Sequence, residues 1–494
     1  MKSLSFQSTS RDSNVQFSAS ATEVGGLPPS TDEADPSSPI RTSTAEAPAK
    51  GRGPAVTRVE KWLLRRLLAA IGNPPVVAVL WTGEEIAPAG QPDPNLTGEP
   101  NLNGDPNLNN EMIRFRIGDR ATFWRILSDP FFQFPEAYCN GRLEVDGDLE
   151  TLMSHVAQSA ALSPQATRWL TYTTKLLHWG SRNTLAASQK NIQHHYDLGN
   201  DFYRLWLDEN LLYTCAYFEE PSVSLEQAQC AKMDHVCRKL ELRAGETVIE
   251  AGCGWGGFAL HMAKHYGVRV RAYNISREQV AEARRRAQAE GLADRVEFVL
   301  EDWRKITGTC DVFVSIGMLE HVGTANYRQL GDVIDGCLAA DGRGLIHTIG
   351  RNQRQPLDPW IERRIFPGAY PPSLGQMSAI FERRDFSMLD VENIRLHYAE
   401  TLRHWLARYE QSVDTVGRLY DERFVRMWRM YLAGSVAAFE WGSLQLFQVL
   451  FARPRRNRLP LTRAHQYAHL FEAPPPSANG DGHRPFETVF WGQR

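Results

Sequence analysis

The segment that most constrains the fold is residues 246–257, which read ETVIEAGCGWGG. It starts as an apolar strand, and the turn after Glu250 contains four glycines: Gly252, Gly254, Gly256 and Gly257. A helical run follows at 258–266, and a second apolar strand is predicted at 268–274. Glycine lets the backbone pass close to a bound ligand, because no Cβ intervenes. A strand, a glycine turn, a helix and a strand in this order predict a nucleotide-binding α/β fold with a parallel sheet.

Polar residues follow the ends of the predicted strands. Further strands are predicted at 295–300, 310–316 and 343–349. The polar residues at or just past a strand end are Glu250, Asn274, Asp302, Glu320 and His347. In open α/β sheets the ligand lies at the carboxyl ends of the strands. Any one of these side chains could instead cap a helix or face solvent, but five at one sheet edge favour a common cleft.

The spacing of the turn also indicates the kind of cofactor. Its Glu-x-Gly-x-Gly-x-Gly pattern resembles motif I of S-adenosylmethionine (SAM) methyltransferases more than the dinucleotide pattern Gly-x-Gly-x-x-Gly. SAM has no pyrophosphate to place on a helix N-terminus, which suits a turn that begins with a carboxylate. The pattern therefore predicts a Rossmann-like SAM methyltransferase fold.

Length and composition limit the other classes of protein. The chain has 494 residues, enough for two or three domains, and 42% hydrophobic residues, enough for ordinary cores. A net charge of −3 gives no global field that would attract nucleic acid. Seven cysteines without a CxxC pair indicate reduced thiols and a cytoplasmic protein. No apolar run reaches the roughly 20 residues that span a bilayer, and no signal peptide is evident, so we expect a soluble or peripheral membrane protein.

Composition and pattern divide the chain into four segments. They are a disordered stretch at 1–56, a small α+β domain at 57–185, a SAM-dependent catalytic domain at 186–469 and a C-terminal tail at 470–494. The small domain carries a polar loop at 93–110 with a repeated D/E-P-N-L-x-G motif, to which we assign no function. His194 and His195 have no partner at metal-ligand spacing, so no metal site is predicted.

Two cationic segments could contact lipid. A helix predicted at 57–72 places one apolar set on a face: Val59, Trp62, Leu63, Leu67 and Ile71. Its basic side chains could touch anionic lipid, although packing of this helix on its own domain is the favoured interpretation. A long helix is predicted at 423–452, and five arginines follow it: Arg453, Arg455, Arg456, Arg458 and Arg463. They could bind phospholipid headgroups, but a solvated basic face is the commoner explanation.

Over about residues 190–465 the chain resembles the cyclopropane-fatty-acyl-phospholipid synthase family, which includes the mycolic acid cyclopropane synthases. The resemblance rests on HYDLGNDFYRLWLDENLLYTCAYF, VIEAGCGWGGFALHMAKHYGVRV, SIGMLEHVG, HTIG and IERRIFPGAYPPS. The segment AYCNGRLEVDGDLETLM is also similar to the small domain that precedes catalysis in the bacterial enzymes.

The resemblance implies a reaction and a set of site residues. The alkene of a phospholipid acyl chain attacks the methyl group of SAM, a bound bicarbonate removes a proton from that methyl group, and the ring closes. The implied bicarbonate pocket consists of Cys215, Glu320, His347 and Tyr398, with the backbone of Ile316. The expected SAM contacts are Tyr213, Thr214, Glu250, Gly252, Gly254, Gly256, Asn274, Gln279, Asp302 and Trp303. Glu320 acting directly as the base is the rival assignment.

Two positions depart from what related enzymes show. Asn274 stands where many methyltransferases place an acidic residue on the ribose hydroxyls, and we expect Asn274 and Gln279 to take this part. Ser435 stands where several family members have a cysteine that is sometimes regarded as the active site. Because a mechanism through bicarbonate requires no thiol, a catalytic role for position 435 is in doubt.

Other functions remain open at this point. The nearest alternative keeps the same site but forms methyl-branched or methylene fatty acids, because the carbocation can also resolve by hydride shift and proton loss. A non-catalytic SAM/lipid-binding module is less favoured, since it would not need Cys215, Glu320, His347 and Tyr398 together. The expected partners are unsaturated phospholipid acyl chains at the membrane surface, and no nucleic acid. We expect a cytoplasmic protein transiently associated with the inner face of the membrane; a homodimer is left open.

Overall fold

The computed structural model describes residues 54–88, 112–163 and 198–471, all within a compact unit that spans Lys50–Arg494. The repeat at 93–110, the histidine pair His194 and His195, and nearly all of 1–56 and 470–494 lie outside the described residues. Among the described helices, none has both the length and the apolar character needed to cross a bilayer.

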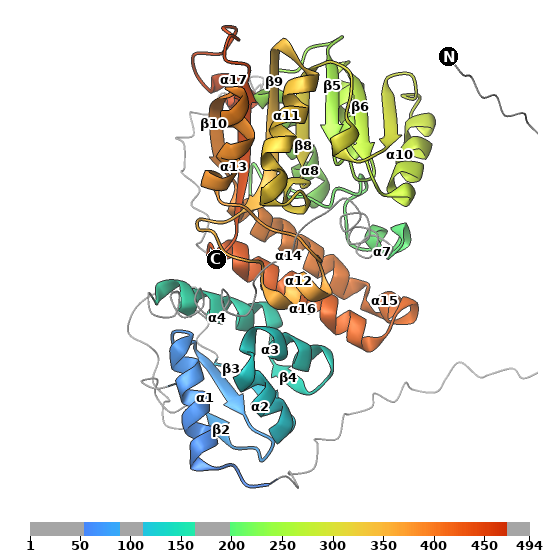
Figure 1. The fold of residues 1–494 in the computed structure, drawn as a ribbon. Coiled ribbons are helices and arrows are strands. Elements are labelled where there is room, and N and C mark those ends of the chain that lie inside the picture. Colours follow the sequence, from blue (N-terminus) through green and yellow to red (C-terminus); the bar gives the residue numbers. More distant parts are fainter. Residues whose placement is uncertain (1–53, 89–111, 164–197, 472–494) are drawn as a thin grey trace, which may run out of the picture. The chain divides into compact units, whose positions relative to one another are not determined.

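The larger sheet has seven strands in the order β10-β11-β9-β8-β5-β6-β7 (Figure 1). The strands are β5 (Thr247–Ala251), β6 (Arg269–Asn274), β7 (Val296–Leu300), β8 (Cys310–Ile316), β9 (Leu338–Gly350), β10 (Ser387–Asn393) and β11 (Gln445–Ala452). Strands β5 to β9 pair in parallel, as predicted, whereas β11 is antiparallel to both β9 and β10. This arrangement confirms the Rossmann-like SAM methyltransferase fold. The predicted helix at 423–452 is wrong in its second half, because β11 occupies Gln445–Ala452.

Helices cover both faces of this sheet. They are α8 (Leu225–Lys239), α9 (Gly257–Tyr266), α10 (Arg277–Ala289), α11 (Tyr327–Cys337) and α13 (Leu374–Phe381), and α17 (Ala464–Phe471) packs against α8. Successive residues of a strand point to opposite faces. Accordingly Val248 joins the core under α8, α9 and α10, whereas Ile249 joins the core under α11 and α13. Burial on both faces explains why β5 has a continuous apolar start.

A second group of helices packs around buried aromatic rings. It contains α7 (Asn200–Arg204), α12 (Pro359–Arg364), α14 (Arg395–Gln411), α15 (Val413–Leu419) and α16 (Glu422–Glu440). Trp206, Trp405 and Trp428 are among its fully buried side chains. Edge-to-face contacts of this kind add to the burial of apolar area, and the Trp206 and Trp405 ring centroids lie 5.6 Å apart.

The N-terminal part forms a small α+β unit with a four-stranded sheet in the order β2-β1-β3-β4. Its elements are α1 (Arg58–Ala70), β1 (Val76–Val79), β2 (Glu85–Ile86), β3 (Ile113–Ile117), α2 (Arg120–Ser128), α3 (Pro130–Cys139), β4 (Leu143–Asp146) and α4 (Leu149–Leu162). Helix α16 contacts α3 and α4, and Arg423 of α16 pairs with Glu136 of α3 at 2.6 Å. The predicted boundary at 185 lies outside the described residues.

The apolar face predicted for helix α1 is only partly correct: Leu67 and Ile71 pack against the core, but Val59 and Trp62 do not. The buried residues are Glu60, Leu64 and Leu68, whereas Val59 is 61% exposed and Trp62 is 57% exposed. Glu60 explains the rotation. It closes a capping box with Thr57 and pairs with Arg120 of α2 at 2.5 Å, so this carboxylate is buried where the pattern suggested a polar face. The outward side of α1 therefore carries a tryptophan and a valine beside its arginines.

Candidate active site

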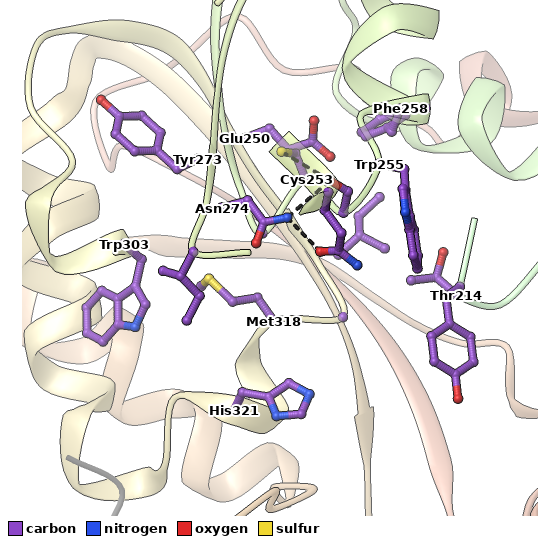
Figure 2. A pocket seen from close by; sticks show the side chains of 18 of the residues that line it. Thr214, Glu250, Cys253, Trp255, Phe258, Tyr273, Asn274, Trp303, Met318 and His321 are labelled. Carbon is purple, nitrogen blue, oxygen red and sulfur yellow. Dashed lines mark hydrogen bonds between the residues drawn. The ribbon is translucent and has the colours of Figure 1, made fainter. Parts of the chain in front are cut away.

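A cavity lies at the carboxyl ends of β5, β6 and β8 and beside the start of the η1 turn (Trp303–Lys305) that follows β7 (Figure 2). Nine of the ten predicted SAM contacts line it: Tyr213, Thr214, Glu250, Gly252, Gly254, Asn274, Gln279, Asp302 and Trp303. Of the five residues that the strand-end argument predicted in one cleft, Glu250, Asn274 and Asp302 line the cavity, whereas Glu320 and His347 do not. Gly256 is the exception and does not line the cavity. A Cβ there would lie 2.5 Å from Phe298 Cζ, so this glycine is needed for packing of α9 on the sheet.

The glycine turn presents bare backbone to the cavity. Gly252 has φ +86°, and a Cβ on it would lie 2.8 Å from the Cβ of Met318. Gly254 has φ +53°, and nothing lies within 4 Å of the Cβ position. Because the first position is closed to a side chain and the second is open, the turn lets a ligand approach the backbone at Gly254.

Asn274 fixes the turn rather than leaving its amide free. Its Nδ2 donates to Gln279 Oε1 at 2.8 Å and to the Gly254 carbonyl at 3.1 Å, and its Oδ1 accepts from Ser276 N at 3.2 Å. Among the described residues, Gln279 Nε2 has no hydrogen-bond partner and remains available to a ligand oxygen. Asp302 is already paired, since both its oxygens lie 3.0 Å from Arg304 Nη1.

Sequence reasoning missed several cavity residues, and Lys232 is the most informative. Lys232 lies on α8, is 1% exposed, and donates from Nζ to Thr214 Oγ1 at 2.9 Å. Burial lowers the pKa of Lys232 to about 8 and raises the pKa of Glu250 to about 8. His321, also at the wall, has its pKa lowered to about 4 by burial and is neutral. The one feature of the sequence that could have pointed to Lys232 was its position, a lysine within the apolar stripe of α8.

The four predicted bicarbonate side chains lie outside the lining of this cavity. Glu320 lies in the η2 turn (Leu319–His321), where burial raises its pKa to about 7. Its Oε1 accepts from the backbone N–H of Ile349 at 2.6 Å, and its Oε2 is buried without a partner. Ile316, whose backbone is predicted to contact bicarbonate, lies in the wall of the cofactor cavity, and the amide that donates to Glu320 belongs to Ile349 of β9.

His347 presents an unpartnered ring nitrogen. Its Nδ1 lies 3.1 Å from Gln448 Nε2, and its Nε2 is buried without a partner. Because the amide nitrogen of Gln448 donates, Nδ1 accepts and the ring proton resides on Nε2. Burial lowers the pKa of His347 well below its ordinary value, so the ring is neutral. Glu320 thus leaves one buried acceptor atom unpaired, and His347 leaves one buried donor atom unpaired.

Cys215 and Tyr398 are both buried, and Tyr398 lies on helix α14. Cys215 is fully buried, and burial raises the pKa of its thiol far above the ordinary value, so it stays protonated. The next amide, Ala216 N, donates to Thr401 Oγ1 at 2.9 Å, one turn beyond Tyr398. The ring of Tyr398 packs on Phe439 at 4.5 Å. The charge of Lys232 acts on both Cys215 and His347.

The carboxyl edge of this Rossmann-like sheet carries a glycine cradle, the Gln279 Nε2 donor and the buried, unpartnered Glu250 Oε2. These groups fit SAM and define a SAM-dependent methyltransferase. The family model "Mycolic acid cyclopropane synthetase" matches residues 183–449, and the chain belongs to this family.

Relatives and solved structures agree with this placement. The chain is 41% identical over 287 residues to a "Probable fatty acid methyltransferase" of Pseudomonas putida, covering 56% of this chain and 73% of the relative. It is 36% identical over 353 residues to the "Cyclopropane-fatty-acyl-phospholipid synthase" of Escherichia coli K12, covering 70% and 90%. The structure of the mycolic acid cyclopropane synthase CmaA1 complexed with SAH and CTAB is similar with a TM-score of 0.51 and 30% identity, over 53% of this chain and 98% of that one.

Proposed function

We propose that the protein transfers the methyl group of SAM to the double bond of an unsaturated phospholipid acyl chain and, with bicarbonate as base, closes a cyclopropane ring. SAM supplies an electrophilic methyl group when bound. The alkene π electrons form the new carbon–carbon bond while the carbon–sulfur bond breaks, and loss of a proton from the added methyl group provides the electrons that close the ring. The observation that carries the proposal is that two polar atoms, Glu320 Oε2 and His347 Nε2, are each buried without a partner in the described part of the chain.

Those two atoms suit a small oxyanion. Glu320 can accept the hydroxyl hydrogen of bicarbonate, and His347 can donate to one of its oxygens. The backbone amide of Ile349 holds Glu320 in place. Tyr398 and Cys215 would border the same ligand from helix α14 and the segment before α8. In the rival assignment, Glu320 itself removes the proton, and bicarbonate dependence of the rate separates the two.

The aromatic residues beside the cavity would protect the carbocation from water. Tyr213 lines the cavity, and its hydroxyl oxygen lies 2.7 Å from that of Tyr431. The ring of Phe366 packs edge-on against Tyr431 at 5.6 Å. Ring faces attract cations, and a wall of this kind excludes water.

We also infer that the protein is cytoplasmic and contacts the inner face of the membrane through the outward side of α1. Val59 and Trp62 are exposed there beside Arg58, Arg65 and Arg66, and Arg66 lies over the Trp62 ring at 5.5 Å. An exposed tryptophan among arginines suits an interface with anionic headgroups.

The C-terminal arginines are a weaker candidate for lipid contact. Arg453 pairs with Asp335, Arg456 with Asp341 and Arg463 with Asp390. Of the five predicted there, only Arg455 and Arg458 have no ion pair among the described residues. Three of these five arginines therefore form ion pairs within the protein.

A methyl-branched or methylene product is the second candidate, because the similar Pseudomonas putida protein is named a probable fatty acid methyltransferase. The test incubates purified protein with SAM and vesicles of unsaturated phospholipid. We expect each modified acyl chain to gain one CH₂, with cyclopropyl protons in the NMR spectrum and a rate that falls when bicarbonate is removed. A branched product, or no transfer, would contradict the proposal.

A further inference from the structure

The ammonium group of Lys232 is only partly satisfied by the protein. Lys232 lies on α8 at the cavity wall, and its one side-chain hydrogen bond within the described part of the chain is to Thr214 Oγ1 at 2.9 Å. An ammonium has three donors and no acceptor, so the threonine oxygen must accept. The hydrogen of the Thr214 hydroxyl then points elsewhere, and Thr214 itself lines the cavity (Figure 2). This wall of the cavity therefore presents a hydroxyl donor backed by a positive charge.

The nearby carboxylates do not neutralise Lys232 directly. Asp208 is turned toward its own loop, where it accepts from Asn210 N at 2.9 Å and from Leu212 N at 2.8 Å. Glu250 influences Lys232 electrostatically, but no ion pair within 4 Å joins them in the described part of the chain, and Glu250 Oε2 is buried without a partner. A buried charge without a partner is costly, so an arriving ligand with complementary charges would be stabilised.

The charged residues along the cavity match the carboxylate and ammonium groups of an amino acid. Among the described lining residues, Lys232 is the only lysine or arginine, and Glu250 is the acid whose oxygen is left unpaired beside the glycine turn. The amino-acid end of SAM carries a carboxylate and an ammonium group. We propose that Lys232, together with the Thr214 hydroxyl, binds that carboxylate, while Glu250 faces the ammonium. The inference rests on SAM binding and is independent of which lipid product forms.

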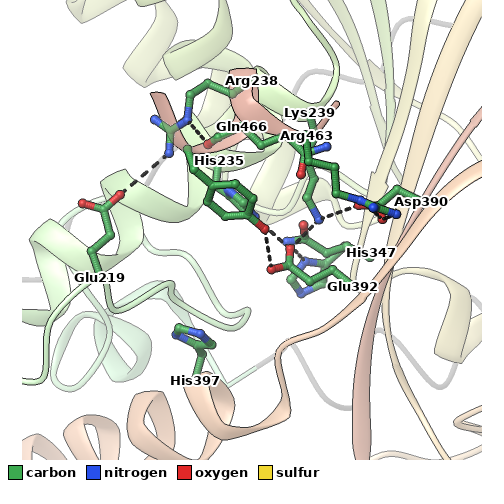
Figure 3. A network of polar contacts seen from close by, with 12 residues as sticks. Glu219, His235, Arg238, Lys239, His347, Asp390, Glu392, His397, Arg463 and Gln466 are labelled. Atoms are coloured by element: carbon green, nitrogen blue, oxygen red, sulfur yellow. Dashed lines mark hydrogen bonds and ion pairs between the residues drawn. The ribbon is translucent and has the colours of Figure 1, made fainter. Parts of the chain in front are cut away.

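The chain provides a matched control in Lys239. It lies seven residues further along α8 and is 2% exposed. Its Nζ pairs with Glu392 at 2.5 Å and lies 3.8 Å from Asp390, in a polar network that does not line the cavity (Figure 3). The same substitution at 232 and 239 therefore removes equally buried ammonium groups from one helix, of which only one faces the ligand.

The experiment compares two ligands by calorimetry: S-adenosylhomocysteine, and 5′-methylthioadenosine, which lacks the amino-acid end. In Lys232→Met we expect the Kd of S-adenosylhomocysteine to rise at least about tenfold, because a charged hydrogen bond is lost. The Kd of 5′-methylthioadenosine should stay within about twofold, which also reports that the cavity is intact. Lys239→Met should leave the ratio of the two constants unchanged.

Thr214→Val provides a second, milder variant that keeps every charge. It should weaken S-adenosylhomocysteine alone, by less than Lys232→Met. The proposal fails if Lys232→Met weakens both ligands equally, if it weakens neither, or if Thr214→Val leaves the ratio unchanged in a folded protein. A variant that binds S-adenosylhomocysteine normally but requires more bicarbonate would also overturn it, since Lys232 would then serve the other ligand.

Discussion

Helix α8 carries two buried lysines, and each faces a different set of partners. Lys239 belongs to a network in which Glu392 Oε2 accepts from Lys239 Nζ at 2.5 Å and from His235 Nε2 at 2.8 Å (Figure 3). Tyr467 completes it by donating to Glu392 Oε1 at 3.2 Å. Lys232, at the cofactor cavity, has one hydrogen bond and no ion pair among the described residues.

The two glutamates of these clusters show what the difference means. Burial alone would raise the pKa of Glu392, but hydrogen bonds and charges from His235 and Lys239 lower it to about 2. Burial raises the pKa of Glu250 to about 8, with only the charge of Lys232 opposing it. A buried ionisable group with all its partners serves the fold, whereas one without them points to a ligand site. Glu320, with its unpartnered Oε2, belongs to the second kind.

The largest expected effect comes from Glu320→Gln, which tests the ligand-facing group. The amide cannot accept bicarbonate's hydrogen as a carboxylate does, so kcat should fall by about 10²–10⁴-fold. Binding of S-adenosylhomocysteine should stay normal, because Glu320 does not line that cavity. Near-normal turnover with bicarbonate dependence intact would remove Glu320 from the mechanism.

Glu392→Gln tests the network in which Glu392 pairs with Lys239 and His235. A pKa lowered from 4.5 to about 2 corresponds to about 3 kcal/mol of stability at pH 7. Because the folded pKa is lowered, this stability is present above pH 4.5 and is lost as the pH falls toward 2. Urea unfolding between pH 7 and pH 3 should therefore show a deficit in the variant that shrinks on acidification. A constant deficit, or weakened S-adenosylhomocysteine binding, would contradict the comparison.

The next prediction concerns the exposed arginines on the outward side of α1. Arg65→Gln with Arg66→Gln should weaken binding to vesicles that contain anionic phospholipid by roughly 30-fold, at about 1 kcal/mol for each arginine. Arg455→Gln with Arg458→Gln removes the same charge elsewhere and serves as the control. If, in a sedimentation assay, only the variant with Arg455→Gln and Arg458→Gln loses affinity for the vesicles, the membrane contact would instead lie in the C-terminal segment.

The smallest effect is expected at Ser435 on α16. Methyl transfer to an alkene requires no covalent enzyme intermediate, and a serine needs an adjacent base to become a nucleophile. The preceding Gly434 faces Met153 of α4, as expected for a helix face that packs on a neighbour. Ser435→Ala and Ser435→Cys should both transfer labelled methyl groups at nearly the normal rate. Loss of transfer in a folded Ser435→Ala protein that binds S-adenosylhomocysteine would show that the mechanism is incomplete.

The sheet edge was predictable, whereas the partners of buried charges were not. Strand ends and glycine spacing are local properties, so they identified Glu250, Asn274 and Asp302 as cavity residues. The run at 445–452 (QLFQVLFA) is buried throughout, and without a clear period it could not be distinguished from the end of a helix. Lys232 could not be found in this way, because its role depends on Thr214, which the chain brings back from 18 residues earlier. The rotation of α1 likewise follows from a contact with Arg120, 60 residues away.

The central claim, that the added methyl group loses a proton to a base and closes a ring, is tested most directly with SAM whose methyl group carries three deuterium atoms. The purified protein is incubated with this SAM and unsaturated phospholipid vesicles, and the modified acyl chains are examined by mass spectrometry and NMR. We expect one deuterium to be lost, so that each modified double bond carries CD₂ within a cyclopropane ring. Retention of CD₃ on a branched chain, or CD₂ in an exocyclic alkene, would contradict ring closure.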